Sequence, residues 1–132
     1  MSDLPPSLED LAVLAELAFA GLPQAVRDLT GDVVFRLDDF PDPQVLADLG
    51  IEDPFELTGL YSGADLAHRS VFDPTPEPAR IFLYRRPILD EWSDRGDISL
   101  LDLITHILVH EIGHHFGLSD ADIEAIEGAE QP

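Results

Sequence analysis

A short stretch near the C-terminal end of the chain combines residue types that could hold a metal ion. His110 and His114 stand four residues apart, and Glu111 directly follows the first of them. Because an α-helix makes one turn in about 3.6 residues, the two imidazoles would lie one turn apart on one helix face. Two histidines at this spacing can bind one Zn²⁺, and the glutamate can reach a water molecule on the metal. The pattern therefore predicts a metal site together with the base that would use it.

The third protein ligand is expected from the turn that follows this helix. Gly117 can adopt a positive φ and reverse the chain, and Asp120 comes three residues later. A carboxylate oxygen is a normal zinc ligand, so Asp120 is the predicted third ligand. Two alternatives stay open. Glu124, one turn further on, competes as the ligand, and Asp120 could simply be a first-turn acid stabilised by the dipole of a last helix.

Three protein ligands leave one coordination position of a zinc ion open, and this predicts hydrolytic chemistry. Zinc would acidify water, and Glu111 would take its proton and later pass it to the leaving amine. The site is therefore expected to be that of a zinc-dependent hydrolase, with Zn²⁺ as cofactor and a peptide bond as the target. A donor to the developing oxyanion is also needed, and Tyr61, Tyr84, Arg85 and Arg86 are the candidates.

The other histidines are not expected to be ligands. His115 lies about 100° round the helix from His114, so it should point elsewhere and either serve a structural role or support a metal ligand. The helical rise between His106 and His114 is about 12 Å, too far for the two to share one ion. His68 has no partner at a meaningful spacing and is expected at the surface.

The elements that must position the site can be read from hydrophobic periodicity and capping residues. A helix beginning after Asp97 or Ser99 and running to Phe116 is apolar around nearly its whole circumference, which is typical of a buried central helix. Ser119 is the expected cap of a last helix over residues 120–127. Ser7, with an acid three residues later, opens an N-terminal helix that has one apolar face.

Short strands and helices are expected in the rest of the chain. Strands are predicted at residues 33–37, 57–61 and 81–84, the last of them stopped by Pro87, and short helices at 44–49 and 88–92. A proline-rich loop is expected over residues 73–79. The predicted fold class is α+β, a small mixed sheet packed on the buried helix, with N- and C-terminal helices. Residues 1–132 are expected to form a single domain.

Composition narrows the class of protein and of partner. The chain has 132 residues and no cysteine, which excludes disulfides and thiolate metal ligands. Its net charge of −20, from 7 basic and 27 acidic residues, would repel nucleic acid, so no nucleic-acid partner is expected. No apolar run is long enough for a membrane span, and the acidic start is unlike a signal peptide, so a cytoplasmic protein is expected.

Several blocks of the sequence resemble a known group of proteins. The run from His110 to Asp120 resembles the elongated metzincin motif, with Asp in place of the third His. Residues 79–87 (ARIFLYRRP), 59–63 (GLYSG) and 110–122 are similar to the small bacterial zincin-like proteins called minimal zincins. The sole methionine is Met1, so the Met-turn of larger metzincins is absent.

This resemblance implies a minimal zincin-like fold and zinc metallopeptidase activity, with Glu111 as the catalytic base. Zincins bind their peptide substrate along an edge strand above the helix that carries the metal ligands. By resemblance, that strand would bind substrate through main-chain pairing and would be formed by Ile81, Phe82, Leu83 and Tyr84. For the side chains of these residues, the alternative of an ordinary core strand stays open. The expected partner is therefore a peptide or protein substrate. The oligomeric state stays open.

An alternative from another functional class stays open beside the peptidase. The chain could be a zinc-binding interaction domain with weak or no catalysis, whose acidic surface holds a basic partner. The two hypotheses differ in one measurable respect. A peptidase loses cleavage after Glu111→Gln, whereas an interaction domain keeps its partner and releases it as the salt concentration rises.

Overall fold

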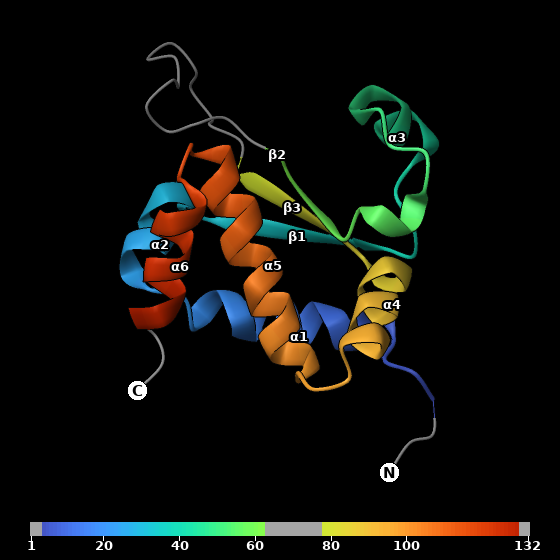
Figure 1. Cartoon of the computed structure of the whole chain (residues 1–132), viewed down its shortest axis with the longest axis horizontal. Helices are drawn as coiled ribbons and strands as arrows, with labels where there is room; N and C mark the ends of the chain where they lie inside the picture. The colour runs from blue at the N-terminus through green and yellow to red at the C-terminus, as the bar shows by residue number, and fades with distance from the viewer. Residues whose placement is uncertain (1–3, 63–77, 130–132) are drawn as a thin grey trace.

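The computed structural model describes residues 4–62 and 78–129, and the side chains up to residue 126. Within these residues the chain forms a small α+β fold with a three-stranded mixed sheet (Figure 1), which confirms the predicted fold class. His68 and nearly all of the predicted loop at 73–79 lie outside the described residues. The helices and strands are, in chain order, α1 (Leu8–Ala20), α2 (Gln24–Thr30), β1 (Val33–Asp38), α3 (Pro43–Leu49), the 3-10 helix η1 (Pro54–Glu56), β2 (Gly59–Ser62), β3 (Ala79–Tyr84), α4 (Arg85–Arg95), α5 (Leu100–His115) and α6 (Asp120–Ala129).

Helix α5 is the centre of the core, as its apolar circumference predicts. Of the two candidate caps it uses Ser99, whose hydroxyl accepts a hydrogen bond from the Asp102 N–H. The helix contacts α1, α2, α4, α6 and β2. Each fully buried Leu or Ile contributes about 1.5–3 kcal/mol, and the buried residues of α5 are Leu100, Leu103, Ile104, Ile107, Leu108, Val109, Ile112 and Gly113.

The sheet order corrects one prediction about substrate binding. The strands lie in the order β1-β3-β2, with β1 parallel and β2 antiparallel to β3. Residues 81–84 are therefore in the central strand, and both of its edges are already paired, so the prediction of an edge strand was wrong. The physical reason is burial on both faces. Ile81, Leu83 and Tyr84 are buried and Phe82 is half-buried, whereas β1 alternates between half-buried and exposed residues.

The segment after β3 corrects a second prediction. Pro87 was expected to stop the strand and to precede a short helix at 88–92, but α4 begins at Arg85 and runs to Arg95. Proline is tolerated in the first turn of a helix because the N–H groups there have no partner within the helix. Pro87 therefore lies inside α4, and the strand passes into the helix without a loop. None of the helices in the described ranges is long and apolar enough to cross a membrane.

Candidate metal centre

The turn between α5 and α6 brings Asp120 back to the end of α5. Gly117 has φ +78°, a conformation that glycine adopts readily, and the Leu118 N–H donates to the Gly113 carbonyl across the turn. Ser119 caps α6, as predicted, in a reciprocal pair of hydrogen bonds with Asp122. Because Asp122 completes this capping box, the carboxylate of Asp120 takes no part in it and can face α5.

His110 and His114 lie one turn apart, and Asp120 contacts the second of them. The centroids of the two imidazole rings are 5.6 Å apart. Asp120 Oδ1 lies 3.2 Å from His114 Nε2. Glu124, the competing ligand, is an exposed residue further along α6. The structure thus brings the carboxylate of Asp120 to His114, the second of the two predicted histidines.

The spacing of these groups fits a zinc ion, although they are not arranged as a finished coordination shell. Two ligand atoms at 2.0–2.2 Å from a tetrahedral ion are about 3.3 Å apart, and two imidazoles on such an ion have centroids about 5 Å apart. Among the described residues, those of the predicted site included, no three His, Asp or Glu side chains are already placed as a metal-binding group. His114 and Asp120 have 55% and 83% of their side-chain surface exposed, so small rotations can re-aim them.

Glu111 is half-buried beside the histidines and is held by the main chain of β2. Its carboxylate accepts a hydrogen bond from the Tyr61 N–H. Burial raises the pKa of Glu111 above its ordinary value, while the charge of His114 and the Tyr61 N–H act in the opposite direction. A carboxylate in this setting is fixed by the main chain of β2, and its burial makes it accept a proton more readily than a carboxylate in water.

Strand β2 is the edge of the sheet that faces this site. In the antiparallel ladder the Tyr84 N–H donates to the Thr58 carbonyl, and every second residue of β2 pairs with β3 in the same way. The main-chain groups of Gly59 and Tyr61 therefore point to the opposite edge, which is where Tyr61 meets Glu111. Residue spacing did not reveal this role for Tyr61. The only signal in the sequence was the 59–63 block, whose function was not evident.

The two neighbouring histidines pack against aromatic partners. The ring of His106 lies 4.1 Å from that of His110, centroid to centroid, and so contacts a predicted ligand. The ring of His115 lies 4.2 Å from that of Tyr61. Phe116 adds an edge contact to the same tyrosine, with the ring centroids 5.6 Å apart. His115 therefore holds β2 against the end of α5, in keeping with the structural role expected for it.

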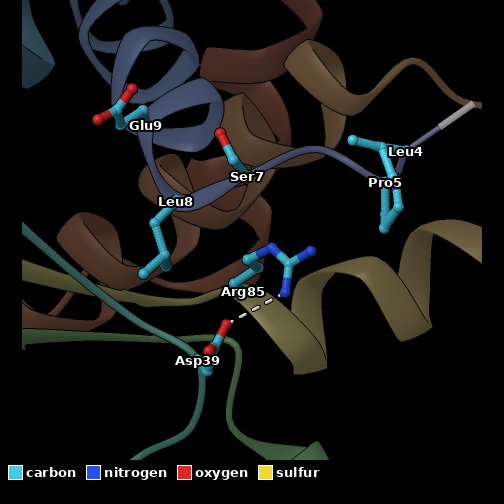
Figure 2. A pocket seen from close by; sticks show the side chains of 7 residues that line it. All are labelled: Leu4, Pro5, Ser7, Leu8, Glu9, Asp39 and Arg85. Carbon is cyan, nitrogen blue, oxygen red and sulfur yellow. Dashed lines mark hydrogen bonds and ion pairs between the residues drawn. The ribbon is translucent and has the colours of Figure 1, made fainter. Parts of the chain in front are cut away.

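Two of the candidate oxyanion donors are engaged elsewhere. Arg85 lines a pocket of about 620 Å³ between the N-terminal segment and the start of α4 (Figure 2), where its guanidinium binds the Pro6 carbonyl and Asp39. The guanidinium of Arg86 lies over the ring of Phe40, 5.8 Å from its centroid. Neither group is held toward the histidines. The pocket contains no residue of α5, and its lining residues are Leu4, Pro5, Ser7, Leu8, Glu9, Asp39 and Arg85.

Gly113 lets α6 approach α5 closely enough to deliver Asp120. A Cβ atom at this position would lie 2.8 Å from both Cγ1 and Cδ1 of the fully buried Ile123. We expect Gly113→Val to lower the free energy of unfolding by about 2 kcal/mol, because overpacking forces α6 away. Urea denaturation measures the loss. In an Ile123→Ala background the same substitution should cost much less, and an equal cost in both backgrounds would show that this contact is not the cause.

Comparison with known proteins identifies the family to which the chain belongs. The family model described as zincin-like metallopeptidase matches residues 30–129, from the end of α2 to the end of α6. None of the curated proteins compared with the chain matches it. The family implies zinc binding and hydrolase activity, and the matched region contains all of the predicted site residues. Because the match spans well over half of the 132 residues, the protein belongs to the zincin-like metallopeptidase family.

Proposed function

We propose that the protein is a zinc-dependent peptidase whose metal is held by His110, His114 and Asp120. The observation that carries this proposal is the convergence of two elements on one point. Helix α5 presents the two imidazoles, and the first residue of α6 returns to within 3.2 Å of His114. Glu111 stands beside them, hydrogen-bonded to the edge of the sheet. A family made of zincin-like metallopeptidases supports the same chemistry.

Each of these residues has a distinct task in peptide hydrolysis. Zn²⁺, when bound, supplies the Lewis acidity that makes water a nucleophile near neutral pH. Glu111 takes the proton from the attacking water and then gives it to the leaving amine. The Tyr61 N–H keeps the Glu111 carboxylate oriented toward the ligands while it carries out both transfers. Tyr84 and the hydroxyl of Tyr61 stay candidates for oxyanion stabilisation.

The outer edge of β2, the edge that is not paired with β3, is the proposed place for the substrate main chain. Because β3 is paired on both sides, main-chain binding of a peptide needs an outer strand of the sheet. Of the two outer strands, β2 contacts α5 and meets Glu111 through Tyr61. A peptide added to β2 would pair with the outward main-chain groups of Gly59 and pass beside the histidines, while the Tyr61 N–H stays bound to Glu111. This transfers the role predicted for residues 81–84 to their neighbour.

Removing and restoring the metal tests the proposal directly. The purified chain should bind one zinc ion per molecule, and the zinc-loaded protein should cleave members of a mixed peptide library. Chelation should abolish cleavage, and reloading with zinc should restore it. Elemental analysis gives the stoichiometry, and mass spectrometry identifies the cleaved bonds. A protein that binds zinc but cleaves nothing in the library would instead favour the interaction-domain alternative, and a protein that binds no zinc would refute both.

A further inference from the structure

An exposed aromatic pair lies on the segment between β1 and β2. Phe40 and Phe55 contact each other edge to face, with centroids 5.2 Å apart and planes 88° apart, and each is 39% exposed. Leu49, on the same segment, is 48% exposed. Neither α3 nor η1 contributes a buried residue. We call residues 39–58 the aromatic lobe. These three side chains meet solvent because they do not belong to the core, and exposed apolar side chains that lie together are a common mark of a binding surface.

The aromatic lobe is continuous with the strand proposed to bind substrate. Helix η1 ends three residues before β2, and Leu57 between them is extended, with φ −112° and ψ 103°. From Leu57 to Tyr61 an extended chain covers about 13 Å. Figure 1 shows α3 and η1 beyond the end of the sheet at which β2 begins. A peptide paired with β2 and placed opposite Tyr61 therefore reaches the lobe about four residues from the bond beside Glu111.

The phenol of Tyr84 gives independent support for this proximity. Tyr84 is buried at the end of β3, and burial is the main reason that its pKa is raised above the ordinary value. The charges of Asp38, Asp42 and Glu111 raise it further. The Tyr84 side chain is thus close enough to interact electrostatically with Asp38 and Asp42, which flank Phe40 in the sequence, and with Glu111 on α5. Tyr84 therefore links the acids that flank Phe40 to Glu111.

The charge of the same segment restricts what it can bind. Residues 38–56 include no Lys or Arg, and their seven acids are Asp38, Asp39, Asp42, Asp48, Glu52, Asp53 and Glu56. Asp42 and Asp53 cap α3 and η1, and Asp39 pairs with Arg85. The other four carboxylates are exposed. One cation from outside the segment, the Arg86 guanidinium, already lies 5.8 Å from the centroid of the Phe40 ring. The four exposed carboxylates outnumber it, so the segment favours a ligand that carries positive charge beside its apolar group and disfavours an acidic one.

We propose that Phe40 and Phe55 form a substrate subsite for a large apolar side chain flanked by Lys or Arg, about four residues from the cleaved bond. This inference rests on the proposed peptidase function, because the aromatic lobe is reached by way of a peptide on β2. The apolar side chain covers the exposed rings, while the basic neighbours meet the carboxylates around them.

Binding without turnover tests the subsite. The zinc-loaded full chain carrying Glu111→Gln is titrated with two sets of fluorescent decapeptides. Each peptide contains one Phe, flanked by two Lys in one set and by two Glu in the other. Within each set, the Phe is moved one position at a time along the peptide. We expect the Lys-flanked peptides to bind more tightly than the Glu-flanked peptides, and most tightly at one position of the Phe. Phe55→Ala should weaken that binding about tenfold, the loss expected for one buried apolar contact. Phe55→Ala should not change the affinity for a peptide that has Ser in place of Phe.

Two control variants separate recognition from folding. Leu17→Ala removes an apolar side chain that is 57% exposed on α1, and it should leave peptide binding unchanged. Glu52→Gln with Glu56→Gln keeps the aromatic pair and should reduce the preference for Lys over Glu flanks. This second pair decides the matter if Phe55→Ala fails to fold. Equal binding of Lys- and Glu-flanked peptides, or binding that ignores both changes, would overturn the subsite.

The readouts also distinguish failure of the subsite from failure of the peptidase. If wild-type protein cleaves peptides but Phe55→Ala leaves KM unchanged, the peptidase stands and the subsite is refuted. If nothing is cleaved while Phe-dependent, Lys-dependent binding persists, the aromatic pair is supported as a peptide-binding surface, and the peptidase is refuted together with the position of that surface relative to a cleaved bond. If both are correct, Phe55→Ala raises KM about tenfold and leaves kcat unchanged, as expected for a contact remote from the reacting bond.

Discussion

Replacing Glu111 with glutamine is expected to lower kcat by about 10²–10⁴-fold while zinc stays bound, because general acid–base catalysis contributes that much. Glutamine keeps the shape of the side chain, and its carbonyl oxygen can still accept the hydrogen bond from the Tyr61 N–H. It cannot take a proton from water. Steady-state cleavage of a library-derived peptide measures kcat, and elemental analysis measures the zinc content of the same sample.

The matched control is another carboxylate near the site. Glu124 lies on α6, is exposed, and is four residues from Asp120. Glu124→Gln removes the same charge without removing the proposed base, so kcat should change little. Cleavage by Glu111→Gln at the wild-type rate would contradict the assignment of Glu111. Loss of zinc from that variant would mean that Glu111 helps to bind the metal, and the lower kcat could then not be assigned to proton transfer.

Local features of the fold could be predicted from the sequence because their causes are local. The ends of α5 follow from Ser99, whose hydroxyl caps the first turn, and from Gly117, whose positive φ ends the helix. The apolar circumference of α5 predicts its burial. The return of Asp120 to His114 was also predictable, since the turn between them is short and contains that glycine.

The sheet order was not predictable, because it depends on pairing between distant segments. The residue types at 81–84 predict a strand, but the two strands that pair with it are formed by residues 33–38 and 59–62, which lie far from it in the sequence. A core strand was the alternative for these residues, and the resemblance to other zincins led instead to the expectation of an edge strand. Tyr61 took part in the site through its main-chain N–H, a group that every residue except proline has. Side-chain type therefore gave no signal for it.

Replacing His114 with alanine is expected to abolish zinc binding at micromolar concentrations of metal. Losing a hydrogen-bonding partner of a ligand costs about 10–100-fold in metal affinity, and losing the ligand itself must cost more. In the wild-type protein, zinc at 100 times its Kd should raise the free energy of unfolding by about 2.7 kcal/mol. This increase should vanish in His114→Ala. Thermal unfolding with and without zinc measures it, because a ligand that binds only the folded state raises Tm.

The same measurement decides between the two carboxylates proposed as the third ligand. Asp120 lies 3.2 Å from His114 Nε2 and takes no part in the capping box of α6, so Asp120→Ala should remove most of the zinc-dependent rise in Tm. Glu124→Ala should retain it. Because both side chains are exposed, neither change should lower the Tm of the metal-free protein by much. The reverse pattern would make Glu124 the ligand and would require α6 to lie across the site, which its contact with Gly113 through Ile123 opposes.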